Sequence, residues 1–295
     1  MQQSIRKPVF LLGVGAQKSG TTWMWSYLNR HPQCAMGRIK EYAVFQAAFL
    51  GNTFPVRRRT RLEQLAKLLT GRRNQLVKGE EPTQTEAILS LMDNIALELD
   101  LDRYIPHFCA LLDSNPGTQL VADITPEYCA LTPEHLTRIR TMLTEGGFDV
   151  RVVYLMRDPV ERCFSMLRMG DRNAGKGTNT TAHQRFAIDA KQPWCERHTR
   201  YDRTIPNLEQ VFRPEELHFD LYEDFISERG VRALTKFLGI DYTAPNLDHR
   251  ANASPRDAEP EADAIAEVRA YYEPVYAFCR ERFGDERIAS LWKHA

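Results

Sequence analysis

Short apolar runs recur along the chain, separated by longer segments in which apolar residues return every three or four positions. The four clearest runs are 9-VFLLGV-14, 119-QLVADI-124, 151-RVVYLM-156 and 217-LHFDLY-222. They are apolar without strict alternation, which is typical of parallel strands covered on both faces. The pattern therefore predicts a buried parallel sheet.

The segments between and after these runs carry the period of an amphipathic helix. We expect helices at 21–30, 61–69, 85–101, 133–144, 159–169, 230–238 and 261–283. Strands that alternate with helices predict an α/β fold, with a central parallel sheet flanked by helices. We expect one domain over residues 1–295, in which 46–118 form a helical insertion on the side that receives an acceptor.

Composition limits the classes of partner. The 295 residues include 39 basic and 39 acidic side chains, so nothing attracts the whole chain to nucleic acid and any anion site must be local. Neither a signal peptide nor an apolar run of membrane-spanning length is visible, which predicts a cytoplasmic protein without an integral membrane segment. The six scattered cysteines form no C-x-x-C pair and no metal-ligand pattern, so we expect reduced thiols and no metal site.

Two polar segments have open interpretations. The insertion contains 57-RRRTR-61 and the pair Arg72 and Arg73, and such a run is usually a solvated helix face. The alternative is contact with an anionic acceptor or partner. The segment 171-DRNAGKGTNTTAHQ-184 is predicted to be a loop, either a plain surface loop or a lid over a neighbouring site.

The first candidate anion site is 15-GAQKSGTT-22, which follows the first strand and opens a helix. Gly20 permits close approach of the main chain, and the free N–H groups of a helix start favour an anion. Lys18 adds a full charge, and the hydroxyls of Thr21 and Thr22 add donors. The order differs from the common nucleotide loop, in which the lysine follows the last glycine.

The second candidate is 157-RDPVERCFS-165, which follows the third apolar run. Arg157 at a strand end can bind a phosphate through two parallel hydrogen bonds, and Ser165 lies eight residues on, along the next helix. Ligands of such sheets bind at the carboxyl ends of the strands, where both segments are expected. The sequence therefore predicts one crevice with two anion-binding elements.

These residues carry a resemblance to a known family. The stretch 17-QKSGTTW-23 resembles the 5′-phosphosulfate loop of sulfotransferases that use 3′-phosphoadenosine 5′-phosphosulfate (PAPS), and 151-RVVYLMRDPVERCFSMLRM-169 is similar to their 3′-phosphate motif. Weaker likenesses lie in 123-DITPEY-128, 201–225 and 249-HRANASPR-256. The resemblance implies a P-loop-like sulfotransferase fold and a PAPS donor that leaves as adenosine 3′,5′-bisphosphate without a metal.

The resemblance also implies which residues hold the donor. They are Gln17, Lys18, Ser19, Gly20, Thr21, Thr22, Trp23, Arg157 and Ser165, with Ser254 and Arg256 in the late loop. Lys18 is expected to stabilise the leaving phosphate as well. Two of these roles keep an alternative: Trp23 stacks on the adenine or packs in the core, and the late loop binds the 3′-phosphate or is an ordinary connection.

A general base is suggested by 40-KEYAVF-45, which resembles the "K-E-x-x-F-F" segment of the glutamate-base glycan and bacterial group. The resemblance implies Glu41 as the base, in place of the histidine of the cytosolic group. Lys40, Asp123 and Thr125 are the candidate substrate residues. Lys40 either is solvated or contacts the sulfuryl group, and Asp123 and Thr125, at the end of the second predicted strand, are expected to point toward the same crevice. Ile124 stands where the glycan group has lysine, so a glycan, a glycolipid and a small alcohol all remain open as acceptors.

Two other functions are compatible with a phosphate-binding loop. A P-loop kinase requires a lysine directly before Ser or Thr, which the order Lys18-Ser19-Gly20 does not supply. A non-catalytic nucleotide-binding module requires no base. The sequence is silent on the oligomeric state.

Overall fold

The computed structural model describes residues 7–51, 54–175, 181–247 and 258–295. Within these ranges a five-stranded parallel sheet has the order β2-β3-β1-β4-β5. The strands are β1 (Val9–Gly15), β2 (Cys34–Ala35), β3 (Leu120–Ile124), β4 (Asp149–Met156) and β5 (Leu217–Leu221). The predicted parallel sheet is confirmed, and each of the four predicted apolar runs overlaps one strand. The short edge strand β2 was not predicted, because two residues show no period.

Both faces of the sheet are covered. On β1, Val9 and Leu11 pack into a cluster with α1 (Thr21–Leu28) and α12 (Glu228–Leu238). Phe10 and Leu12 point to the opposite face, into a larger cluster. This double burial is the reason that the strands read as continuous apolar runs.

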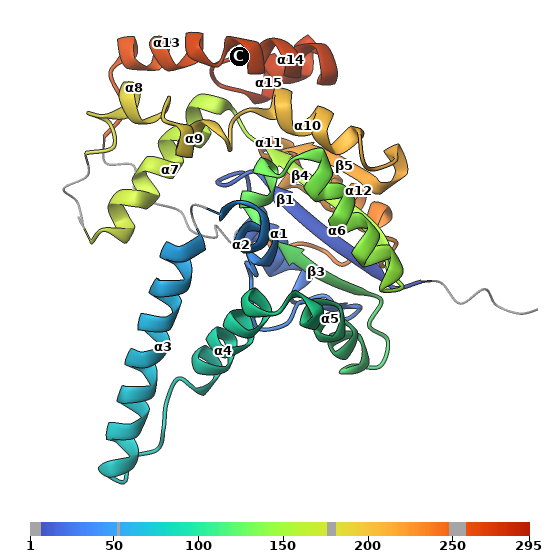
Figure 1. The fold of residues 1–295 in the computed structure, drawn as a ribbon. Coiled ribbons are helices and arrows are strands. Elements are labelled where there is room, and N and C mark those ends of the chain that lie inside the picture. Colours follow the sequence, from blue (N-terminus) through green and yellow to red (C-terminus); the bar gives the residue numbers. More distant parts are fainter. Residues whose placement is uncertain (1–6, 52–53, 176–180, 248–257) are drawn as a thin grey trace, which may run out of the picture.

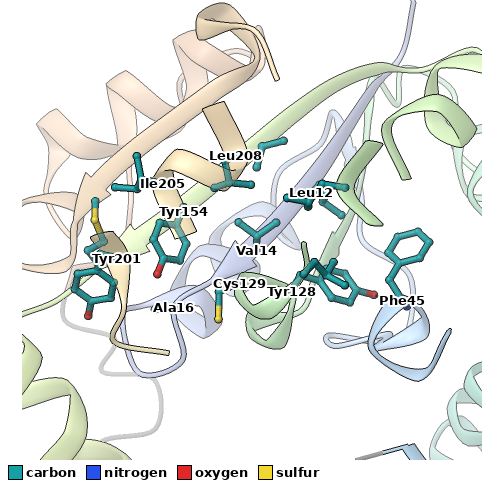
Figure 2. Packing of buried hydrophobic residues seen from close by; sticks show 14 of the residues in the cluster. Leu12, Val14, Ala16, Phe45, Tyr128, Cys129, Tyr154, Tyr201, Ile205 and Leu208 are labelled. Carbon is teal, nitrogen blue, oxygen red and sulfur yellow. Dashed lines mark hydrogen bonds between the residues drawn. The ribbon is translucent and has the colours of Figure 1, made fainter. Parts of the chain in front are cut away.

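The larger cluster lies against α5 (Tyr104–Asp113), α6 (Pro133–Glu145) and α10 (Tyr201–Glu209). Figure 2 shows part of it, in which Val14 of β1 lies near Tyr154 and Tyr128. The other helices are α2 (Val44–Phe49), α3 (Phe54–Val77), α4 (Thr85–Leu99), α7 (Pro159–Asn173), α8 (Phe186–Asp189), α9 (Pro193–Glu196), α11 (Tyr222–Phe225), α13 (Ala262–Tyr271), α14 (Glu273–Phe283) and α15 (Asp285–Leu291).

Two helix predictions need correction. The helix expected at 261–283 is divided at Tyr272 into α13 and α14, with Pro274 in the first turn of α14, since proline is tolerated at a helix start but not in its interior. The helix expected at 61–69 is the middle of α3, which has 24 residues. The parts of α3 outside 61–69 are rich in Arg, which favours helix without contributing an apolar period.

The predicted loop at 171–184 begins inside α7, so its first residues are helical. Residues 176–180 lie outside the described residues. Asp171 on α7 is buried and accepts hydrogen bonds from the backbone N–H of Thr181 (2.9 Å) and from Arg185 (2.8 Å). One buried carboxylate therefore ties together the two sides of this segment.

The insertion consists of α3, α4 and α5. In Figure 1, α3 projects away from the sheet, and the chain returns toward it through α4. Among the described helices, none combines the length and the apolar character that crossing a membrane requires.

Candidate active site

The loop between β1 and α1 is shaped by two glycines. Gly15 has φ 130° and Gly20 has φ 95°, a backbone region that side chains rarely adopt. A Cβ atom on Gly15 would lie 2.9 Å from the carbonyl oxygen of Pro126, and one on Gly20 would lie 3.1 Å from the ring of Tyr222. A side chain at Gly15 would therefore clash with the backbone, and one at Gly20 would require the Tyr222 ring to shift, in addition to the strain of the positive φ.

The loop also holds buried polar atoms. Ser19 is fully buried, and its hydroxyl has no hydrogen-bond partner among the described residues. The same holds for the side-chain oxygen of Gln17. Gly20 caps α1 without a side-chain hydrogen bond, and Thr21 and Thr22 open the helix. A buried polar group without a partner is costly, so the loop is arranged to meet a polar ligand.

Arg157 brings the second predicted element to this loop. It follows β4, and its guanidinium lies 3.5 Å from the carbonyl oxygen of Lys18 and 3.2 Å from the carboxylate of Glu161. It also lies over the ring of Tyr222, 4.8 Å from the centroid. The two anion-binding elements predicted from the sequence thus meet in one place, as expected for neighbouring parallel strands.

The helix after Arg157 adds two cations that sequence reasoning missed. Ser165 is buried on α7, and Arg168 and Arg172 follow it by three and seven residues, so all three lie along one face. Both arginines lower the pKa of Lys18, which places their charges near its ammonium. The helical spacing from Ser165 was the signal that would have identified them.

Lys18 is the centre of a positively charged site. Burial and the charges of Arg172, Arg157, Arg168 and Lys40, in that order, lower the pKa of Lys18 to about 8. Its ammonium lies 3.8 Å from the sulfur of Met169 and has no carboxylate partner among the described side chains. This excess of positive charge favours a multiply charged anion.

Glu41 lies beside the same charges. Its carboxylate forms an ion pair with Lys40 at 2.5 Å, and its side chain is 37% exposed. Lys40 also lowers the pKa of Lys18, as the weakest of the four charges that do so. Glu41 is thus solvent-accessible and paired with one of the cations that act on Lys18.

Asp123 and Thr125, which we expected to point toward the crevice, lie in the interior of the protein. Both are fully buried. Asp123 accepts hydrogen bonds from Thr125 (2.7 Å), Tyr128 (2.7 Å) and Tyr104 (2.9 Å). Burial raises the pKa of Asp123 to about 6, although these hydrogen bonds act in the opposite direction. With its lone pairs committed to three hydroxyls, this carboxylate supports the structure.

The Asp123 cluster supports the segment that carries Glu41. The hydroxyl of Thr125 accepts a hydrogen bond from the backbone N–H of Ala43 (3.1 Å), and that of Tyr128 accepts one from Phe45 (3.3 Å). Ala43 has φ 57°, a left-handed conformation that these contacts hold in place. The end of β3 therefore fixes the backbone two residues after Glu41.

Trp23 packs in the core. It is 5% exposed, stacks on Tyr27 with centroids 6.0 Å apart, and meets Phe225 edge to face. One edge lines a cavity between α1 and residues 243–246. Ser254 and Arg256, the two residues of the late loop that were predicted to hold PAPS, lie outside the described residues. All six cysteines are free thiols, as expected.

The model of the sulfotransferase family matches residues 8–244, which include both anion-binding elements and Glu41. The chain belongs to this family. Residues 249–256, which carry the predicted late loop, lie beyond the part of the chain that the family model matches. The sequence of this chain has no significant match among curated proteins.

Solved structures agree on the fold of this sulfotransferase. The chain is similar to a sulfotransferase from Alicyclobacillus acidocaldarius, with 20% identity, a TM-score of 0.54, and 94% of this chain and 95% of that chain covered. It also matches the sulfotransferase domain of an olefin synthase from Synechococcus PCC 7002, with 15% identity, a TM-score of 0.44, and 92% and 97% covered. At 20% identity the first of these likenesses shows the fold alone, and together with the family match it confirms the predicted P-loop-like sulfotransferase fold.

Proposed function

We propose that this sulfotransferase moves a sulfuryl group from PAPS to a hydroxyl, or secondarily an amine, of a glycan, a glycolipid or a small molecule. The observation that carries the proposal is the meeting of two anion-binding elements. The loop around Lys18 and the strand end at Arg157 are in contact, and each is suited to a separate phosphate.

The described residues fit a nucleotide with two phosphate groups. The loop from Gln17 to Thr22 would hold the 5′-phosphosulfate, where the Ser19 hydroxyl is buried without a partner. Arg157 and Ser165 would hold the 3′-phosphate. When bound, PAPS supplies the sulfuryl group and leaves as adenosine 3′,5′-bisphosphate.

The charged residues divide the electrostatic work. Lys18, at the centre of the cluster, would neutralise the charge that develops on the leaving phosphate, a contribution typical of transfer reactions of this kind. The charges of Arg168 and Arg172 act on Lys18 and would stabilise further negative charge on the transferred group. Their effect is large because Lys18 is partly removed from water.

Glu41 would accept the proton of the acceptor hydroxyl. It is exposed enough to meet an acceptor, and Lys40 holds its carboxylate at the edge of the cationic cluster. The contacts of Thr125 and Tyr128 with the following backbone would keep the carboxylate in position. Positioning of this kind contributes much of the rate in group transfer.

The substitution Glu41→Gln tests the base directly. We expect kcat to fall about 10²–10⁴-fold, as for a lost general base, with unchanged affinity for adenosine 3′,5′-bisphosphate. Turnover is measured with the best acceptor from a panel of glycans, glycolipids and alcohols. Glu63→Gln, on the exposed side of α3, is the matched control. Near-normal turnover in Glu41→Gln would remove Glu41 from the mechanism.

A further inference from the structure

Residues 292–294, which we call the C-terminal segment, are anchored on the start of α7. Trp292 is buried, and its indole N–H donates a hydrogen bond to the carboxylate of Glu223 (3.2 Å). The backbone N–H of His294 donates to the carboxylate of Asp158 (2.8 Å), which caps α7. The segment therefore lies against the element to which the proposed function assigns the 3′-phosphate.

Glu161 lies between the C-terminal segment and Arg157. It is buried in the first turn of α7, with a side chain that is 11% exposed. One of its carboxylate oxygens accepts a hydrogen bond from the guanidinium of Arg157 (3.2 Å). The other oxygen lies 3.9 Å from Nζ of Lys293 and 3.7 Å from Nε2 of His294. Glu161 thus contacts the phosphate-binding arginine on one side and two basic side chains on the other.

A carboxylate beside a phosphate site is unfavourable unless its charge is compensated. A phosphate at Arg157 would take the hydrogen bond that Glu161 now accepts, so two anions would compete for one guanidinium. Lys293 is a cation on a flexible side chain that is 61% exposed, and His294 adds a positive charge when it is protonated. These two side chains therefore offer Glu161 other partners when a phosphate occupies Arg157.

We propose that Lys293 and His294 are positioning residues of the 3′-phosphate site. By holding the carboxylate of Glu161, they leave the guanidinium of Arg157 available to the phosphate and compensate the negative charge beside it. The inference rests on the proposed function, since it requires a 3′-phosphate at Arg157. It goes further by giving a role in donor binding to a segment outside residues 8–244, which the family model matches.

Calorimetric titration of the full chain tests the inference with adenosine 3′,5′-bisphosphate and with adenosine 5′-phosphate, which lacks only the 3′-phosphate. The double variant Lys293→Ala/His294→Ala removes both basic side chains but keeps the backbone N–H that donates to Asp158. It should bind the bisphosphate about two- to fivefold more weakly, the range for partly exposed ion pairs, and adenosine 5′-phosphate normally. Lys236→Ala, at an exposed lysine of α12, is the matched control and should bind both nucleotides normally.

The substitution Glu161→Gln tests whether the effect passes through this carboxylate. Glutamine keeps the shape of the side chain and removes the charge that competes for Arg157, so the bisphosphate should bind at least as tightly as in the wild type. In the Glu161→Gln background, Lys293→Ala/His294→Ala should cause no further loss, because no carboxylate is left to hold. Lys293→Arg, which keeps the charge, should retain the wild-type affinity. Circular dichroism verifies that all variants are folded.

The two nucleotides separate the inference from the proposed function. An equal loss for both in the double variant would mean that the C-terminal segment only supports the fold, and a loss that persists with Glu161→Gln would mean that Glu161 is not involved. Either result, or a normal bisphosphate affinity in the double variant, would overturn the inference. A wild type without a preference for the bisphosphate over adenosine 5′-phosphate would contradict the proposed function, and the inference with it.

Discussion

Lys18 combines a central position with reduced basicity. Its pKa of about 8 results from burial and from four neighbouring cations. At neutral pH it is still mainly protonated, and a bound phosphate would favour the protonated form further. Binding of a multiply charged anion should therefore be linked to the charge of this one side chain.

The pH dependence of binding follows. Lys18 loses its proton as the pH rises through about 8, so affinity for adenosine 3′,5′-bisphosphate should fall between pH 7 and pH 9. The fall should approach about tenfold per pH unit above the pKa. In Lys18→Met the affinity should be lower at pH 7 and nearly independent of pH over this range. Calorimetric titrations at several pH values measure both; parallel profiles would reject the role of Lys18.

Gly20→Ala separates a binding role from backbone strain. Both Gly20 (φ 95°) and Gly147 (φ 91°) have positive φ, so alanine at either should cost about 1 kcal/mol of stability. Only at Gly20 does a Cβ approach another group, the Tyr222 ring beside Arg157. Gly20→Ala should therefore lose about tenfold or more in bisphosphate affinity, and Gly147→Ala none. Equal affinities in the two variants would contradict the account.

At the scale of elements, the sequence predicted the arrangement of the two anion-binding segments. Both follow buried strands, and parallel strands end at the same edge of a sheet, so their meeting required no knowledge of the loops. The support of Glu41 was not predictable in this way. It depends on Tyr104 of the insertion, which no local pattern connects to Asp123.

The burial of Asp123 and Thr125 was unpredictable for the same reason. Their position at the carboxyl end of β3 correctly indicated the crevice, but the direction of the side chains depends on what covers the strand. The segment from Tyr42 to Phe45 covers it, so both residues are buried. Position at a strand end shows that a residue is near a site. It does not show whether another segment lies between that residue and the ligand.

Thr125→Val tests whether this support matters for turnover. The variant leaves the backbone N–H of Ala43 without its acceptor, which should cost about 1–3 kcal/mol of stability. If Glu41 shifts as a result, kcat should fall about 10–100-fold, with unchanged bisphosphate affinity. Thr125→Ser should restore kcat. Thr235→Val, at a buried threonine of α12, is the control and should affect stability only. A normal kcat in Thr125→Val would show that Thr125 has only a structural role.

For the whole molecule, a net charge of zero conceals two separated groups of charge. One lies around Lys18 at the edge of the sheet, and the other lies along α3, which carries seven basic and one acidic side chain. Composition excluded a bulk attraction to anions and pointed to a local site, and the structure contains a local group of cations around Lys18. It gave no indication of the second group, because the full length of α3 appears only in the folded chain (Figure 1).

The central claim is that the chain has separate sites for the 5′- and 3′-phosphates of one nucleotide. Its most direct test is calorimetric titration of the metal-free protein with adenosine 3′,5′-bisphosphate, using ADP for comparison and Arg157→Ala as the variant. We predict that the wild type binds the bisphosphate at least about tenfold more tightly than ADP, and that Arg157→Ala removes this preference. Equal affinity of the wild type for the two nucleotides, or binding that requires magnesium, would contradict the claim and favour a kinase-like site.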